Sequence, residues 1–243
     1  MSGHSKWSTI KRKKGANDAK RGAIFTRLSK DIALAAREGG DDPDMNSALR
    51  LAIKKAKSSN MPSSNIERAI KKGTGQLEGV NYESHLYEGY GPHGVAIMME
   101  VMTDNKNRTI PEIRHIMSKN SGNLGESGCV SWIFEKKGTI TIDKKTANED
   151  KLINDCLEFE VDDISSEDDT FYEIIVNPDI FNDFCSYLEK KEYSVEAELC
   201  LSPQNTVKVS SSNSSEIINL LTLLEDHEDI QKVYSNLEIE NIN

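Results

Sequence analysis

Long apolar runs and aromatic residues are scarce in this chain of 243 residues, in which Phe, Trp and Tyr make up only 6%. Apolar runs reach only five residues, as at 95–99, where Glu100 ends the run. A membrane-spanning helix needs about 20 such residues. Residues 1–7 also lack the apolar stretch of a secretory signal. We therefore expect a cytoplasmic protein that neither enters a membrane nor is exported.

Cysteine is equally sparse. The chain has four cysteines, namely Cys129, Cys156, Cys185 and Cys200. No two of them have the Cys-x-x-Cys spacing that zinc sites and redox dithiols use. The sequence therefore predicts reduced, mostly buried thiols, with no metal site.

Motifs that carry catalytic chemistry are missing too. The five histidines are scattered, and no zinc-protease, nucleophile-elbow, phosphate-loop or dinucleotide fingerprint occurs. The glycine-rich stretch 89–94 lacks the Lys-Ser/Thr pair of a phosphate loop and lies between two predicted strands, so we interpret it as a turn. We expect a protein that is not an enzyme and needs no cofactor. An enzyme that uses a cleft between domains is the rival hypothesis from another class.

What the chain has in abundance is charge, and the charge is unevenly placed. The whole chain carries a net charge of −10. Residues 1–75 hold 17 basic and 7 acidic side chains, a net charge of +10, whereas residues 76–243 hold 13 and 33, a net charge of −20. Such asymmetry indicates a basic module on an acidic body. A basic module of this kind is typical of a phosphate-binding surface.

Hydrophobic periodicity predicts three amphipathic helices in the basic module, at 18–37, 45–58 and 63–72. Glycines follow the first and third helix at 39–40 and 73–75, as expected of helix ends. On the first helix the apolar positions share one face. These positions are Ile24, Phe25, Leu28, Ile32, Ala35 and Ala36, and the opposite side carries Lys20, Arg27, Lys30 and Arg37. The sequence thus predicts a small bundle preceded by a flexible basic arm.

The near-absence of acidic residues suggests what the basic side chains are for. Residues 1–37 carry ten basic side chains but only Asp18 and Asp31 as acidic ones. A merely solvated helix usually mixes signs, because oppositely charged neighbours one turn apart stabilise it. We therefore predict a nucleic-acid-binding surface. Its candidate residues are Lys6, Trp7, Lys11, Arg12, Lys13, Lys14, Lys20, Arg21, Arg27, Lys30, Arg37, Arg50, Lys54 and Lys57. Trp7 fits either stacking on a base or docking on the bundle as an apolar anchor.

From residue 82 the apolar period changes from 3.6 to 2, which indicates strands. We predict strands at 83–89, 94–103, 130–134, 138–143, 159–164, 170–176, 193–200, 206–210 and 231–239, and helices at 108–119, 147–157, 178–190 and 214–226. Between 138 and 200 the order is β-α-β-β-α-β, the ferredoxin-like pattern.

The predicted fold class is α+β and multidomain, with an N-terminal three-helix bundle and two α+β domains, one ferredoxin-like and inserted in the other. The predicted limits are 1–75 for the basic helical domain, 76–129 with 204–243 for the discontinuous domain, and 130–203 for the insertion. The last strand–helix–strand segment is too small to stand alone, so we expect strands 206–210 and 231–239 to join the sheet of 83–103.

Several ordered motifs run from the first residues into the second domain. They are Gly3-His4-Ser5-Lys6-Trp7, Asp18-Ala19-Lys20-Arg21-Gly22, Phe25-Thr26, Ala35-Ala36-Arg37-Glu38-Gly39-Gly40, Asn60-Met61-Pro62, Asn65-Ile66, Tyr87-Glu88-Gly89-Tyr90-Gly91-Pro92 and Thr103-Asp104-Asn105-Lys106-Asn107-Arg108-Thr109. With them the chain closely resembles the YebC/PmpR family, which includes the mitochondrial translational activator of cytochrome oxidase. The resemblance implies three domains and a non-enzymatic regulator of gene expression.

Two functions within that class follow from the resemblance. Bacterial relatives are described as DNA-binding transcriptional regulators, and other members as translation factors that act at the ribosome. We expect a DNA-binding transcriptional regulator that grips phosphates through residues 1–75. The alternative is a ribosome-associated translation factor that binds ribosomal RNA, which the absence of a tight helix-turn-helix pattern favours. The expected partners are therefore duplex DNA or ribosomal RNA, with the transcription machinery or the ribosome. The sequence leaves the oligomeric state open and is compatible with a monomer.

Overall fold

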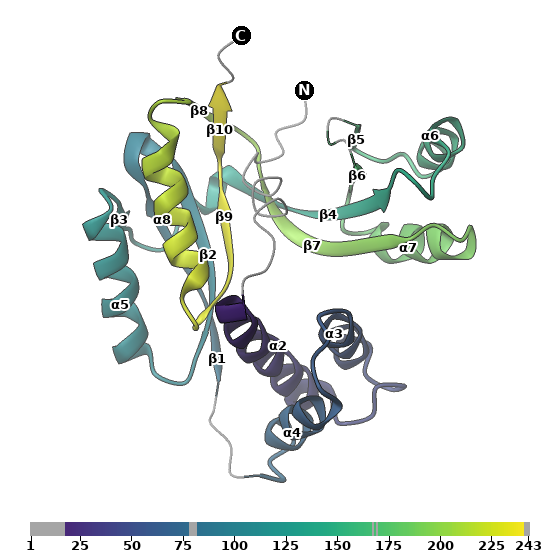
Figure 1. Ribbon diagram of the computed structural model, residues 1–243, viewed down its shortest axis with the longest axis horizontal. Helices are drawn as coiled ribbons and strands as arrows, with labels where there is room; N and C mark the ends of the chain where they lie inside the picture. Colours follow the sequence, from purple (N-terminus) through teal and green to yellow (C-terminus); the bar gives the residue numbers. More distant parts are fainter. Residues whose placement is uncertain (1–17, 78–81, 167, 169, 241–243) are drawn as a thin grey trace.

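The computed structural model describes residues 18–77, 82–166, 168 and 170–240. Figure 1 shows three parts: a group of helices, a sheet with two long helices beside it, and a second sheet with two shorter helices. This is the predicted class, a helical N-terminal domain followed by two α+β domains, and the prediction is confirmed. The second sheet is inserted between strands of the first in the sequence.

The helical domain consists of α2 (Asp18–Gly39), α3 (Ser47–Ser58) and α4 (Ser63–Gly73). Their apolar stripes meet in one core, which contains Leu28, Ile32, Ala36, Leu49, Ala56, Ile66 and Ala69. Gly73 allows α4 to pack closely on α2, because a Cβ there would lie 2.2 Å from the carbonyl oxygen of Ala33. Asn46 caps α3 by accepting a hydrogen bond from the Leu49 amide.

The first sheet has the order β3-β1-β2-β9, and all its neighbouring strands are antiparallel. Its strands are β1 (Glu83–Tyr90), β2 (Ala96–Thr103), β3 (Asn123–Leu124) and β9 (Ile230–Ser235), and α5 (Lys106–Lys119) and α8 (Ser214–Asp226) accompany them. One face of β2 packs with residues of both helices in a single apolar core. The two helices lie side by side on this face (Figure 1).

The end of the chain departs from the prediction. Strand β8 (Val207–Ser210) pairs in parallel with β10 (Leu237–Glu240), and these two form a separate ribbon. The predicted strand 231–239 is interrupted at Asn236, which is buried. The Asn236 side chain accepts a hydrogen bond from the Ala96 amide and donates one to the Asn205 carbonyl. It therefore links the start of β2 to the segment just before β8, at the point where the chain leaves the first sheet. Only β9 of the two predicted strands joins the sheet of β1 and β2.

The inserted domain has the ferredoxin-like strand order β5-β6-β4-β7, with every pair antiparallel. Its elements are β4 (Phe134–Asp143), α6 (Glu149–Glu158), β5 (Asp163–Ser165), β6 (Phe171–Val176), α7 (Phe181–Lys190) and β7 (Val195–Pro203). The predicted separation of strands 130–134 and 138–143 is wrong, because β4 is continuous from Phe134 to Asp143. Gly138 is needed for packing: a Cβ there would lie 2.3 Å from the Phe181 ring. The predicted strand 130–134 is mostly a 3-10 turn, η2 (Ser131–Ile133).

Strand β2 joins the two α+β domains. Ala96 and Met98 point to the side away from α5 and α8, where they pack with Val130, Ile133 and Phe134 at the entry to the inserted domain. The strand is therefore covered on both faces. Helix α2 meets the same sheet where β2 ends and β9 begins, and it forms the junction described next.

Candidate nucleic-acid interface and the α2 junction

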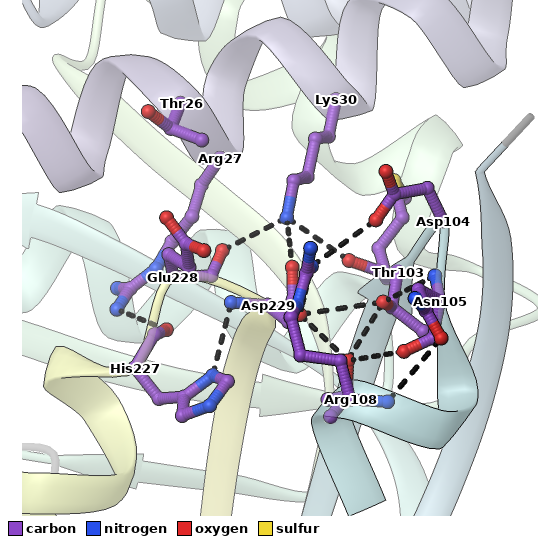
Figure 2. A network of polar contacts seen from close by, with 12 residues as sticks. Thr26, Arg27, Lys30, Thr103, Asp104, Asn105, Arg108, His227, Glu228 and Asp229 are labelled. Atoms are coloured by element: carbon purple, nitrogen blue, oxygen red, sulfur yellow. Dashed lines mark hydrogen bonds and ion pairs between the residues drawn. The ribbon is translucent and has the colours of Figure 1, made fainter. Parts of the chain in front are cut away.

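Lys30, predicted to face solvent, lies in a buried junction between α2 and the first sheet, with 4% of its surface exposed. Its Nζ donates to Asp229 Oδ1 at 2.6 Å and to the carbonyl oxygens of Met102 and Glu228 at 3.1 and 3.0 Å. Figure 2 shows two of these acceptors, on Glu228 and Asp229, close to the ammonium group. All three N–H donors of the lysine are therefore used.

Asp229 is the centre of this junction. Its second oxygen accepts hydrogen bonds from Thr109 Oγ1 at 2.7 Å, Arg108 at 2.9 Å and Thr103 Oγ1 at 3.3 Å (Figure 2). Burial alone would raise the pKa of Asp229, but hydrogen bonds from Lys30, Thr109 and Arg108 outweigh it and hold the pKa well below its usual value. The segment 103–109, singled out above as a family motif, thus supplies three partners of one buried carboxylate.

Two further cations of α2 also contact the first α+β domain. Arg27 donates to the His227 carbonyl oxygen at 3.3 Å, and burial lowers the pKa of its guanidinium. Arg37 is exposed but donates to the Tyr82 carbonyl oxygen at 2.9 Å. The expectation that Lys30 and Arg27 form a solvent-facing basic stripe is therefore wrong. Around Arg27 and Lys30, the α2 face opposite the bundle core packs against the chain's own acidic domain.

The remaining sequence-predicted residues have different positions. Lys57 is exposed, Arg50 donates to the carbonyl oxygens of Pro43 and Asp44, and Lys54 forms an ion pair with Glu189 of α7 at 3.0 Å. The helix backbone at Lys20 and Arg21 is described but their side chains are not. The predicted arm residues Lys6, Trp7, Lys11, Arg12, Lys13 and Lys14 lie outside the described residues.

Helices α3 and α4 carry more exposed basic residues than the prediction named. We call the α3/α4 basic surface the seven exposed residues Arg50, Lys54, Lys55, Lys57, Arg68, Lys71 and Lys72. The prediction missed Lys55, Arg68, Lys71 and Lys72. The signal was present, because Arg68, Lys71 and Lys72 have the i, i+3, i+4 spacing that places side chains on one face of a helix.

Glu67 is the single acidic residue of these two helices. Within the described part of the chain, Lys55, Lys57, Arg68, Lys71 and Lys72 form no ion pair. Lysines in the last turn of each helix gain from the helix dipole, which accounts for the four lysines at these ends. The dipole does not account for Arg50 or Arg68, nor for the lack of balancing acids.

A groove of about 250 Å³ lies between α2 and α4 where the chain leaves the helical domain. Its walls include Phe25 and Ser29 from α2, Asn65, Arg68 and Lys72 from α4, and Tyr82 just before β1. None of the described residues that line it is acidic. The α3/α4 basic surface thus continues into a hollow that has aromatic walls.

Several backbone amides also converge at the loop 128–131, where they could bind an anion, but a side chain of the protein already occupies this position. The carboxylate of Glu88 accepts hydrogen bonds at 2.8 Å from the backbone amides of Gly128, Val130 and Ser131. Burial would raise the pKa of Glu88, but these bonds lower it below its usual value. The loop 128–131 is therefore an anion cradle whose anion is Glu88, which fixes the loop that leads into the inserted domain.

The cysteines have no arrangement suited to redox or metal chemistry. All four are free, but only Cys156 is buried and the other three are half-buried, so the predicted burial is only partly right. Burial raises the pKa of Cys156 and of Cys185 to about 11. No group of three His, Cys, Asp or Glu that would suit a metal ion occurs among the described residues. No helix in the described ranges is long and apolar enough to cross a membrane.

Two family sequence models cover nearly the whole chain. The TACO1/YebC N-terminal domain matches residues 5–76, and the TACO1/YebC second and third domain matches residues 82–237. The chain belongs to the TACO1/YebC family. The two matches meet between residues 76 and 82, at the passage from α4 to β1.

Relatives within the TACO1/YebC family are similar over their full length. A "probable transcriptional regulatory protein" from Desulfotalea psychrophila is 54% identical over 99% of this chain and 96% of its own. One of the same name from Geobacter sulfurreducens is 52% identical over 98% and 96%. The crystal structure of a conserved hypothetical protein from Aquifex aeolicus, 41% identical, superposes with a TM-score of 0.84 and covers 93% of both chains.

Proposed function

We propose that this protein is a regulator of gene expression that binds duplex DNA, gripping phosphates through the α3/α4 basic surface. The observation that carries the proposal is the seven exposed cations against one acid on two adjacent helices of a chain whose net charge is −10. The names of the relatives, which describe transcriptional regulators, support the same class.

The chemistry of the surface determines the kind of binding. Lysine and arginine side chains on helix faces contact phosphates, which fix position on DNA but carry no sequence information. The surface has no Asn- or Gln-rich stripe suited to paired contacts with adenine. We therefore expect binding that is weakly sequence-selective and strongly dependent on salt. The buried Lys30 and the half-buried Arg27 take no part in it.

The test is a salt titration of duplex DNA binding by the full chain. If about 5–7 phosphates are engaged, log K falls with log salt with a slope near −5 to −6. Replacing Lys55, Lys57 and Lys71 with glutamine removes three cations, so the slope becomes shallower by about 3 and affinity at ~150 mM salt falls about 100-fold.

The matched control carries the same charge change elsewhere. Lys136, Lys145 and Lys190 are exposed lysines of the inserted domain, and replacing them with glutamine is expected to change affinity less than about threefold. Equal losses in both triple variants contradict the proposed surface. A preference above ~1,000-fold for a native promoter over scrambled DNA contradicts phosphate gripping as the basis of binding. The full chain is also tested for co-sedimentation with ribosomes at the same salt concentration. If more of it binds to ribosomes than to DNA, the target is ribosomal RNA and not duplex DNA.

A further inference from the structure

We infer that the groove between α2 and α4 is a binding site for one unpaired nucleotide of the bound nucleic acid. The inference rests on the proposed function and deepens it, because it names the part of the nucleic acid that enters the groove when the α3/α4 basic surface binds the phosphates. The groove has a volume of about 250 Å³, which is below the usual range for drug-sized ligands, about 300–1,000 Å³, and suits a single base with part of its sugar.

The walls provide the surfaces that a base requires. Phe25 from α2 and Tyr82 from the segment before β1 contribute aromatic rings to the lining. Stacking on aromatic rings is the main way in which proteins hold unpaired bases. Asn65 adds an amide, which offers a donor and an acceptor to the edge of a base.

The rim provides the charge that a phosphate requires. Arg68 and Lys72 line the groove, and both are exposed and without an ion-pair partner in the described residues. They lie four positions apart on α4 and so share one side of that helix. The described lining carries two cations and no acid, which favours an anion in the groove.

The Lys30 junction holds one wall in place. Lys30 Nζ lies 5.5 Å from the centre of the Tyr82 ring, and Arg37 donates a hydrogen bond to the Tyr82 carbonyl oxygen. The same lysine is fixed by Asp229. The Tyr82 wall is therefore fixed before a ligand arrives, which lowers the entropy cost of binding.

The test compares full-chain affinity for two DNA probes at matched salt: a 20-base-pair duplex and the same duplex with one unpaired thymidine. Stacking of one base predicts a preference of about 5- to 100-fold for the second probe. A matched pair of RNA stems, with and without an unpaired uridine, shows which nucleic acid supplies the nucleotide. Equal affinity for paired and bulged probes in both sets overturns the inference.

Two variants locate the preference in the groove. Ser29→Phe fills the groove, and Asn65→Leu removes the amide at nearly constant size. Each is expected to reduce the preference for the bulged probe, to about twofold or less in Ser29→Phe, and to leave affinity for the paired duplex within about twofold. A preference that survives in the correctly folded variants overturns the inference. Loss of binding to every probe by the wild-type chain is instead a failure of the proposed function.

A readout on the unaltered chain keeps the inference testable if Ser29→Phe does not fold. The unpaired uridine of the RNA probe is replaced with 5-iodouridine, and the unpaired thymidine of the DNA probe is replaced with 5-iodo-2′-deoxyuridine. Both analogues photo-crosslink to aromatic side chains in contact with the base. Mass spectrometry is expected to locate the crosslink at Phe25 or Tyr82, with none from the same base in a paired position. A crosslink at any other residue overturns the inference.

Discussion

The basic residues of α2 and those of α3 and α4 look alike in the sequence but have opposite environments. Lys30 of α2 is 4% exposed and bound to Asp229, whereas Lys71 and Lys72 of α4 are exposed and without an ion pair in the described ranges. Both sets lie on helices of one basic module. A basic stripe therefore does not reveal whether its anionic partner is a nucleic acid or the chain's own acidic domain.

The two environments have different energetic consequences. Removing one partner of a buried ion pair leaves an unpaired charge and costs about 3–5 kcal/mol. Exposed charges contribute little to folding, since water solvates them in both states. The α2 cations are therefore expected to determine domain docking, and the α3/α4 cations to determine binding of an external anion.

The largest effect is expected from Lys30→Glu. The new carboxylate would face Asp229 inside the junction, so we expect the free energy of unfolding to fall by about 5 kcal/mol, with separation of α2 from the first sheet. Lys71→Glu is the matched charge reversal on α4, and we expect it to change the free energy of unfolding by about 0.5 kcal/mol or less. Urea unfolding of both variants measures the contrast. Similar destabilisation by the two changes contradicts the comparison.

A smaller effect is expected from acid. Because the pKa of Asp229 is lower in the folded chain than in the unfolded chain, the unfolded chain is protonated first as the pH falls. The stability that Asp229 contributes is therefore fully present above about pH 4 and is lost as the pH falls further. Asp229→Asn, which has no carboxylate at this position, is expected to cost about 3 kcal/mol at neutral pH.

The measurement is the free energy of unfolding of wild type and variant from pH 6 to pH 2.5. The difference between them is expected to shrink below about pH 4. Asp179→Asn replaces an exposed carboxylate and serves as the control, with a small difference at all pH values. A difference between wild type and Asp229→Asn that stays constant with pH shows that Asp229 does not titrate in this way.

Local sequence patterns predicted most of the helices and strands. In an amphipathic helix or an alternating strand, the spacing of the apolar residues itself shows which face is buried. Helix α2 was expected at 18–37 and spans Asp18–Gly39. Failures occurred where a distant residue decides the local outcome. Gly138 reads as a break, yet the Phe181 ring packed against it requires a glycine inside a continuous strand. Asn236 reads as an ordinary strand residue, yet its bonds to Ala96 and Asn205 divide β9 from β10.

The candidate site was less predictable for the same reason. Lys30 and Asp229 are separated by 199 positions, and no periodicity links them. The groove was also beyond a pattern-based prediction, since its walls come from α2, α4 and Tyr82. By contrast, Lys71 and Lys72 were visible as an acid-free cluster at the end of a predicted helix. A count of basic and acidic residues for each predicted helix, instead of for the whole segment 1–75, would have placed these two lysines among the candidate residues.

The smallest expected effect concerns Lys54, which lies between the two classes of cation. Lys54 is on α3 yet forms an ion pair with Glu189 of the inserted domain, and both side chains are more than half exposed. Such pairs contribute about 0–1 kcal/mol to stability, so Glu189→Ala is expected to change the free energy of unfolding by less than about 1 kcal/mol.

Removing the Glu189 carboxylate also leaves Lys54 available to bind a phosphate, so DNA affinity is expected to rise by about two- to fivefold at low salt and less at high salt. Glu192→Ala removes another exposed acid of the same domain and serves as the control. A loss of stability above about 2 kcal/mol with unchanged DNA affinity places Lys54 with Lys30, as a docking residue, and removes it from the α3/α4 basic surface.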